Sequence, residues 1–289
     1  MGHGTWTTTS YASYSSTLGR SYDTTTSRVT GQTYEAKYLD KTLDPKNFEV
    51  RECCNTNEHP NTIPVILGLD VTGSMGEACS EVAAALGTIM KSLYDKFDDI
   101  EFCIMGIGDL AYDNAPIQMS QFESDIRIAE CLDKVYMEHG GGGNEYESYT
   151  AAWYMGLKRT KLDCFDKQGR KGIIITMGDE PLNPYLPKRA LNRAIDGTEQ
   201  EDIETDKLYE EASKKFDIFH IAVNSPKDCF IYNEKQIKKT FGELLGLNFK
   251  ISTINDLSKT IEDCITESVN SIPVFKEVNT VNENGEISW

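Results

Sequence analysis

The sequence predicts an α/β fold with a doubly wound, mainly parallel central sheet flanked by helices, a three-layer arrangement of the Rossmann type, preceded by an irregular N-terminal extension. Three observations predict it. Short apolar runs rich in β-branched residues recur along the chain, amphipathic helical patterns lie between them, and residues 1–60 hold to neither period for long. Strands that alternate with helices are typical of a parallel sheet covered on both faces.

The first half of the expected domain alternates strands and helices. Ile63 to Asp70 is an apolar run that ends at a carboxylate, and Glu77 to Phe97 carries apolar residues at helical spacing. Ile100 to Ile107 is a second apolar run. Pro116 to Phe122 fits a short edge strand, because a proline without an N–H costs least at an edge. A helix is expected over 124–137.

The second half continues the alternation. In order, we expect a helix over 147–159, a strand over 172–177, helical material over 188–216, a strand over 216–223, a helix over 231–245, a strand over 248–254 and a helix over 257–269. His220 lies among apolar residues of the fourth of these elements, with no second histidine at ligand spacing. We therefore expect it to pack in the core.

The chain divides into three expected segments. Residues 1–60 are rich in Ser, Thr and Tyr and are expected to be extended or disordered, lying across the domain or docking on a partner. Residues 61–272 form the α/β domain, and 273–289 form a polar C-terminal tail.

Composition narrows the class of protein. The formal net charge of −17 would repel nucleic acid. No apolar run approaches the roughly 18 residues of a membrane span, and the N-terminus has no apolar segment typical of a secretory signal. We therefore expect a cytoplasmic protein without a membrane or nucleic-acid partner. Eight cysteines without a C-x-x-C spacing are expected to be reduced.

Oxygen-bearing side chains follow the first strand. Asp70, Thr72 and Ser74 come at its end, where ligands of open α/β sheets bind. Carboxylates and hydroxyls without imidazole or thiolate suit Mg²⁺, Mn²⁺ or Ca²⁺ rather than zinc. The alternative is that Thr72 or Ser74 merely caps the following helix.

Two further polar loops are expected at the same edge of the sheet. Asp179 follows the strand over 172–177, and the glycines at 140–143 are followed by Asn144, Glu145 and Glu147. Parallel strands bring their carboxyl ends together, so the first and third loops should meet. Asp109, after the strand over 100–107, is a candidate for supporting the ligands. Together, the loops favour a metal site over separate helix caps.

These motifs resemble the metal-ion-dependent adhesion site of the von Willebrand factor A (vWA) domain family. Asp70, Thr72 and Ser74 match its Asp-x-Ser-x-Ser motif, with a threonine that keeps the hydroxyl, and Asp179 matches its third element. The family usually has a threonine behind a Gly-Gly pair. Here the glycine loop is similar to a Gly-Gly-Gly-Asp-x-Pro-Glu variant, with Asn144 and Glu147 in the acidic places. The resemblance covers roughly 61–270 and leaves the second loop's ligand open between Asn144, Glu145 and Glu147.

The resemblance implies a non-enzymatic, divalent-cation-dependent adhesion or adaptor module. Thr72 and Ser74 would ligate Mg²⁺ directly, and Asp70 and Asp179 directly or through water. One position would stay open for an Asp or Glu carboxylate of a protein partner, with an ATPase-containing assembly as one candidate.

The alternative is a Mg²⁺-dependent phosphoryl-transfer enzyme with Asp70 as nucleophile. Such enzymes usually carry a second carboxylate two residues on, where this chain has Thr72. The four histidines allow no convincing Ser/His/Asp arrangement, since His3 and His59 lie in the irregular N-terminal part.

Overall fold

A six-stranded sheet forms the centre of the computed structural model, which describes residues 4–31, 36–138, 146–224 and 230–271. The strand order is β12-β11-β8-β4-β5-β6; all neighbours are parallel except the edge strand β6, which is antiparallel to β5. The expected edge strand is thus confirmed. The strands are β4 (Ile63–Asp70), β5 (Ile100–Ile107), β6 (Ile117–Met119), β8 (Gly172–Gly178), β11 (Phe216–Val223) and β12 (Phe249–Ser252).

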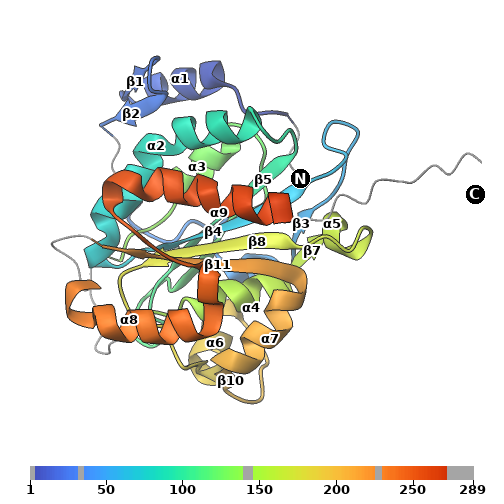
Figure 1. The fold of residues 1–289 in the computed structure, drawn as a ribbon, viewed down its shortest axis with the longest axis vertical. Coiled ribbons are helices and arrows are strands. Elements are labelled where there is room, and N and C mark those ends of the chain that lie inside the picture. Colours follow the sequence, from blue (N-terminus) through green and yellow to red (C-terminus); the bar gives the residue numbers. More distant parts are fainter. Residues whose placement is uncertain (1–3, 32–35, 139–145, 225–229, 272–289) are drawn as a thin grey trace, which may run out of the picture.

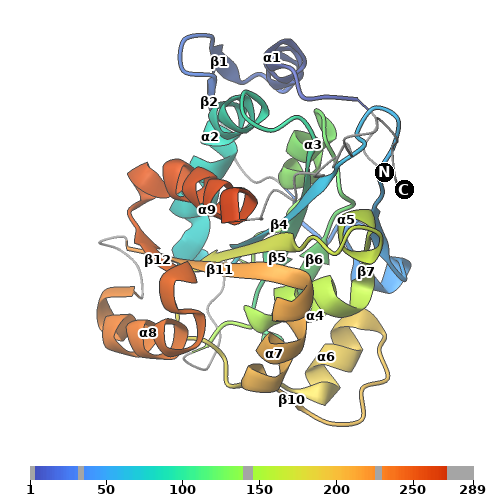
Figure 2. The same ribbon diagram turned by 45° about the vertical axis from the view of Figure 1, so that its right-hand side comes forward.

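Helices cover both faces of this sheet (Figures 1 and 2). One face carries α2 (Gly76–Tyr94), α3 (Arg127–Asp133) and α9 (Leu257–Ser271), and the other carries α4 (Thr150–Arg159), α6 (Lys188–Ile195), α7 (Thr205–Lys215) and α8 (Phe230–Leu245). Side chains of one strand alternate between two apolar cores: Leu67 and Leu69 of β4 lie in the first and Ile66 in the second. The sheet is therefore buried on both sides, which explains its nearly continuous apolar strands.

The sheet order reverses at β4. The chain adds β5 and β6 on one side of β4 and then crosses to add β8, β11 and β12 on the other. In the β4–β8 pair Leu69 lies opposite Met177, so these two strands end side by side. In open α/β sheets such a reversal point, beyond the carboxyl ends of the strands, is where ligands bind.

Several elements differ from the predicted ones. The helix expected over 124–137 is only α3, and that expected from 147 starts at Thr150. The helical material over 188–216 is two helices, because α6 ends at Asp196 in the left-handed conformation (φ 52°). Short elements that the patterns did not indicate are β3 (Arg51–Cys53), β7 (Thr160–Leu162), α5 (Asp163–Asp166), β9 (Tyr185–Leu186) and β10 (Ile203–Glu204).

Part of the N-terminal segment is helical rather than extended or disordered, and the segment lies across the domain, which was one of the expectations from its composition. It forms α1 (Thr8–Thr17) and the hairpin β1 (Ser21–Asp23)–β2 (Arg28–Thr30), which lie on α2 (Figure 1). Trp6 and Tyr11 are 5% and 2% exposed, and the Tyr11 hydroxyl donates to the Ala83 carbonyl oxygen at 3.1 Å. A few aromatic side chains thus supply the burial that the Ser- and Thr-rich sequence otherwise lacks.

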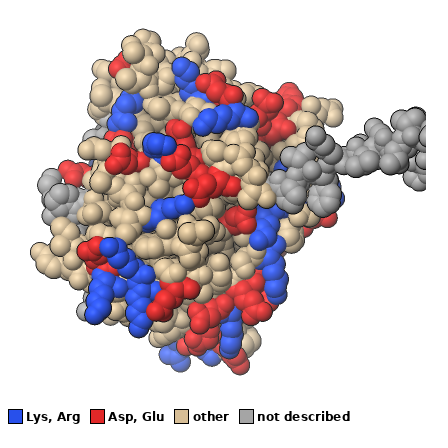
Figure 3. All heavy atoms as spheres, in the orientation of Figure 1, with Lys and Arg blue, Asp and Glu red and all other residues tan. Residues whose placement is uncertain are grey.

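Acidic and basic side chains are interspersed over the face of the molecule that is drawn in Figure 3. The described cysteines are free thiols. His220 is fully buried and stacks on Phe241 with ring centroids 3.6 Å apart, which confirms its packing role. No helix within the described ranges has the length and apolar character needed to cross a membrane.

Candidate functional site

Two loops at the carboxyl edge of the sheet bring the predicted residues together. Asp70 is the last residue of β4, and the chain then turns through a short 3₁₀ helix (Gly73–Met75) into α2. Asp179 follows directly after β8. Because β4 and β8 are adjacent and parallel, their last carboxylates lie on the same edge.

Hydrogen bonds arrange the four residues as two hydroxyl–carboxylate pairs. Oδ1 of Asp70 accepts the Thr72 backbone N–H at 2.9 Å and the Thr72 hydroxyl at 2.6 Å. The Ser74 hydroxyl donates to Oδ1 of Asp179 at 3.1 Å, across 105 positions of sequence. The predicted meeting of the first and third loops is therefore present. Asp70 and Asp179 are 0% exposed, whereas Ser74 is only partly buried.

The two hydroxyls do not cap a helix. Thr72 precedes the 3₁₀ helix without a side-chain hydrogen bond to its backbone, and α2 likewise begins without a side-chain cap. Both hydroxyl protons point instead to carboxylates, which leaves the oxygen lone pairs available. The capping alternative thus does not account for Thr72 and Ser74.

Tyr149, which the sequence did not single out for the site, joins these loops. Its hydroxyl donates to Oδ2 of Asp70 at 2.7 Å and accepts the Glu180 backbone N–H at 3.3 Å. In the sequence Tyr149 looks like any inward-facing aromatic residue of a helix, and no local pattern marks it. Only the tertiary fold brings its ring to the ends of β4 and β8.

Several carboxyl groups gather in this buried place. Burial, and next the Asp179 carboxylate, raise the pKa of Asp70 to about 7. Burial also raises the pKa of Glu147 far above its usual range. The negative charges of Asp70, Glu180, Asp113 and Asp109 raise it further, by smaller amounts. Every charge that shifts the pKa of these two groups is negative.

The other predicted site residues are Glu147, Asp109, Asn144 and Glu145. Glu147 is 3% exposed, and its Oε2 has no hydrogen-bond partner among the described residues. Asp109 lies in the loop after β5, where its Oδ1 accepts the Ala111 N–H at 2.7 Å. Asn144, Glu145 and the glycines at 140–143 lie outside the described residues.

The residues fit a hard cation when hydroxyls are included. Within the described part of the chain, no three His, Cys, Asp or Glu side chains form a group that could hold a metal ion. A cation would therefore also need the hydroxyl oxygens of Thr72 and Ser74, and water. The all-oxygen donor set, the buried carboxylates and the orphaned Glu147 oxygen suit Mg²⁺, Mn²⁺ or Ca²⁺.

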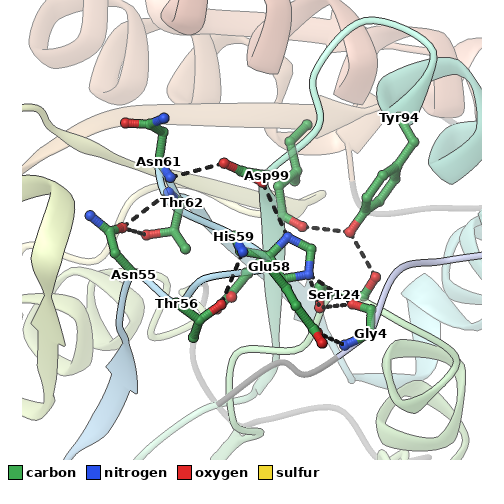
Figure 4. Close-up of polar contacts among 12 residues, drawn as sticks. Gly4, Asn55, Thr56, Glu58, His59, Asn61, Thr62, Tyr94, Asp99 and Ser124 are labelled. Carbon is green, nitrogen blue, oxygen red and sulfur yellow. Dashed lines mark hydrogen bonds and ion pairs between the residues drawn. The ribbon is translucent and has the colours of Figure 1, made fainter.

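A serine, a histidine and an aspartate also meet at the other end of the sheet (Figure 4). Nδ1 of His59 lies 3.2 Å from Oδ1 of Asp99, and Nε2 lies 3.4 Å from the Ser124 hydroxyl. However, the Gly4 carbonyl oxygen takes the Ser124 hydroxyl at 2.6 Å and lies 2.9 Å from Nε2. The three side chains are buried, and Ser124 and His59 bind Gly4 of the N-terminal segment while Asp99 holds the His59 ring, so this cluster is a structural anchor.

Comparison with known proteins gives only distant structural likenesses. No protein-family model and no curated protein sequence matches the chain. Among solved structures, the chain is similar to the pilus adhesin SpaC of Lactobacillus rhamnosus GG in its open conformation, with a TM-score of 0.49 and 10% identity. That match covers 74% of this chain and 30% of the adhesin, so the chain spans less than a third of the adhesin's length.

Two further likenesses are similar in strength. The vWF domain of the type V pili tip protein Mfa5 from Porphyromonas gingivalis has a TM-score of 0.43 and 12% identity, with 72% of this chain and 95% of that domain covered. The PilB minor pilin of Streptococcus sanguinis has a TM-score of 0.42 and 14% identity, with 71% and 61% covered. At these scores the likenesses carry no argument about what this chain binds.

Proposed function

We propose that this chain is a non-enzymatic protein-binding module with a doubly wound, vWA-like fold, which uses a divalent cation at the carboxyl edge of its sheet to capture a carboxylate of a protein partner. The observation that carries the proposal is the pair of hydroxyl–carboxylate contacts, Thr72 with Asp70 and Ser74 with Asp179. The reversal of strand order at β4, next to β8, supports the doubly wound topology.

Thr72 and Ser74 are the proposed direct ligands. Their protons are held by Asp70 and Asp179, so each hydroxyl oxygen can offer a lone pair. The buried carboxylates supply the negative charge that a cation requires, and Mg²⁺ is the first candidate because it accepts a few protein oxygens together with water and an external anion. Ser74 is the most exposed of the four, so the partner's Asp or Glu is expected to approach from its side.

The geometry favours binding over phosphoryl transfer. As a nucleophile, Asp70 would have to present a free carboxylate oxygen to a substrate. It is 0% exposed, and its two oxygens accept three hydrogen bonds, two from Thr72 and one from Tyr149. We therefore propose the binding module rather than the phosphoryl-transfer enzyme. An ATPase-containing assembly as its partner stays a prediction.

Calorimetric titration with Mg²⁺ and with Mn²⁺ tests the proposal. We expect wild-type protein to bind either ion, and Ser74→Ala to bind at least tenfold more weakly, because losing even a residue that supports a metal ligand typically costs about 10- to 100-fold in affinity. Ser80→Ala is the matched control: its hydroxyl lies on α2 and donates to the Gly76 carbonyl oxygen at 2.8 Å, away from the carboxylates. Equal binding by wild type and Ser74→Ala would reject the site.

Capture of a partner is tested separately. Once the wild type is shown to bind an ion, a partner recovered with it should be released by EDTA and should not be recovered with Ser74→Ala. Retention of the same partner in EDTA would mean that the cation plays no part in its binding.

A further inference from the structure

The hydroxyl of Tyr149 lies between the two loops of the candidate site. It donates to Oδ2 of Asp70 at 2.7 Å and accepts the backbone N–H of Glu180 at 3.3 Å. One phenol oxygen thus connects the end of β4 with the residue that follows Asp179. The side chain is 0% exposed, so water does not compete for these contacts.

The surroundings hold this phenol in a single place. A Cβ added to Gly178, the last residue of β8, would lie 2.0 Å from the Tyr149 oxygen, so the hydroxyl passes over the strand end only because residue 178 has no side chain. On its other sides the ring packs against His220 and Phe241, with centroids 4.9 and 5.9 Å away. The oxygen therefore cannot move far without displacing the core.

The hydrogen bonds give the phenol a defined effect on the site. Thr72 holds Oδ1 of Asp70 with two donors, and Tyr149 holds Oδ2, so the orientation of the carboxylate is fixed at both oxygens. The Thr72 hydroxyl proton is directed by that carboxylate. The contact with Glu180 fixes the distance between the two loops. The phenol therefore helps to set the spacing of the proposed oxygen ligands, beside the hydrogen bond from Ser74 to Asp179.

We propose that Tyr149 is a positioning residue that holds the two loops at the spacing of a small divalent cation, so that the site favours Mg²⁺ over Ca²⁺. This inference rests on the proposed function. Mg²⁺ demands nearly ideal octahedral geometry with short bonds, whereas Ca²⁺ accepts longer and more irregular arrangements. Loosening the loops therefore weakens Mg²⁺ binding more than Ca²⁺ binding.

Tyr149→Phe is the direct test, because it removes one oxygen and keeps the packed ring. Calorimetric titration with Mg²⁺ alone and with Ca²⁺ alone should show Mg²⁺ affinity reduced by about 10- to 100-fold, as for other residues that support metal ligands, and a smaller change for Ca²⁺. The matched control is Tyr154→Phe on α4, the helix that begins directly after Tyr149; it also removes a phenol–carboxylate hydrogen bond, to Oε1 of Glu199 at 2.7 Å. It should leave both affinities unchanged.

The outcomes separate this inference from the proposed function. If the wild type binds neither ion, the proposed function fails. If the wild type binds and Tyr149→Phe has the same or higher Mg²⁺ affinity, or loses both ions equally, the positioning role is overturned. Gly178→Ala is a second variant, which displaces the phenol without removing it, and it should shift the Mg²⁺-to-Ca²⁺ ratio in the same direction. Thermal unfolding in EDTA checks that each variant is folded.

Discussion

Asp70→Asn tests whether the candidate site is destabilising when no cation is present. Burial and the Asp179 carboxylate raise the pKa of Asp70 from 3.8 to about 7. Asparagine has nearly the same shape, keeps an oxygen for the two Thr72 donors and carries no charge. The variant should therefore be more stable than the wild type at alkaline pH in EDTA, although it loses the carboxylate of a proposed binding site.

The magnitude follows from the pKa. A carboxyl group with a raised pKa binds its proton more tightly in the folded chain, so its favourable contribution is complete below pH 3.8 and is lost as the pH rises to about 7. At about 1.4 kcal/mol per pKa unit, full ionisation lowers the stability by on the order of 4 kcal/mol. Rearranging the Tyr149 hydrogen bond offsets about 1 kcal/mol of the gain.

Urea denaturation measured in EDTA at pH 4 and pH 8 checks this expectation. The variant should exceed the wild type by roughly 3 kcal/mol at pH 8 and by little or nothing at pH 4. Saturating Mg²⁺ should reduce or reverse the difference, since a ligand at 100 times its Kd stabilises the native state by about 2.7 kcal/mol and only the wild type is expected to bind it well.

Asp163→Asn provides a control of opposite sign. Asp163 is also buried, but its Oδ2 accepts from Lys167 and from the Asn55 N–H at 2.8 and 3.0 Å, and the Lys167 hydrogen bond lowers its pKa. That substitution should lower stability at pH 8. The reasoning about Asp70 is refuted if Asp70→Asn is less stable than wild type at pH 8 in EDTA, or if the difference between them is the same at both pH values.

Two other expectations concern the rest of the molecule. Trp6→Ala should lower the free energy of unfolding by about 3–5 kcal/mol, as for other buried aromatic residues, because Trp6 belongs to the first of the two apolar cores. A change below about 1 kcal/mol in urea denaturation would mean that the N-terminal segment adds little to stability. Burial raises the pKa of the Cys79 and Cys264 thiols, so a thiol reagent at pH 8 should leave both unmodified in the native state and modify them in urea. Peptide mass spectrometry can identify the modified cysteines. Rapid labelling of Cys79 in the native protein would contradict the packing of α2 on the sheet.

The sequence was sufficient for the sheet and for two of the site's loops. Apolar strands separated by amphipathic helices indicate a parallel sheet, and parallel strands bring their carboxyl ends together whatever lies between them. The meeting of the loops that carry Ser74 and Asp179 follows from that rule, whereas their hydrogen bond is a feature of the structure. The short apolar runs likewise located the six strands of the central sheet to within a few residues.

What the sequence did not indicate depends on single tertiary contacts. Helix α1 consists largely of Ser, Thr and Tyr, so no apolar stripe marks it, and its place depends on Trp6 and Tyr11. The anchor of Ser124, His59 and Asp99 joins residues from three separate segments. Tyr149 has the pattern of a core residue, and only its hydroxyl, which periodicity does not register, relates it to Asp70.

The buried carboxyl groups at the β4–β8 edge also give a physical reason to expect a cation there. Among the described residues, no ion pair joins Asp70 or Glu147 to a lysine or arginine, and both side chains are almost fully buried. When ionised, such groups lower stability unless a positive charge offsets them. Amides in the same places would avoid that penalty while keeping most hydrogen bonds. A cation held by Thr72, Ser74 and the two aspartates would supply the missing charge, so the same carboxylates that weaken the metal-free fold would become the source of its affinity.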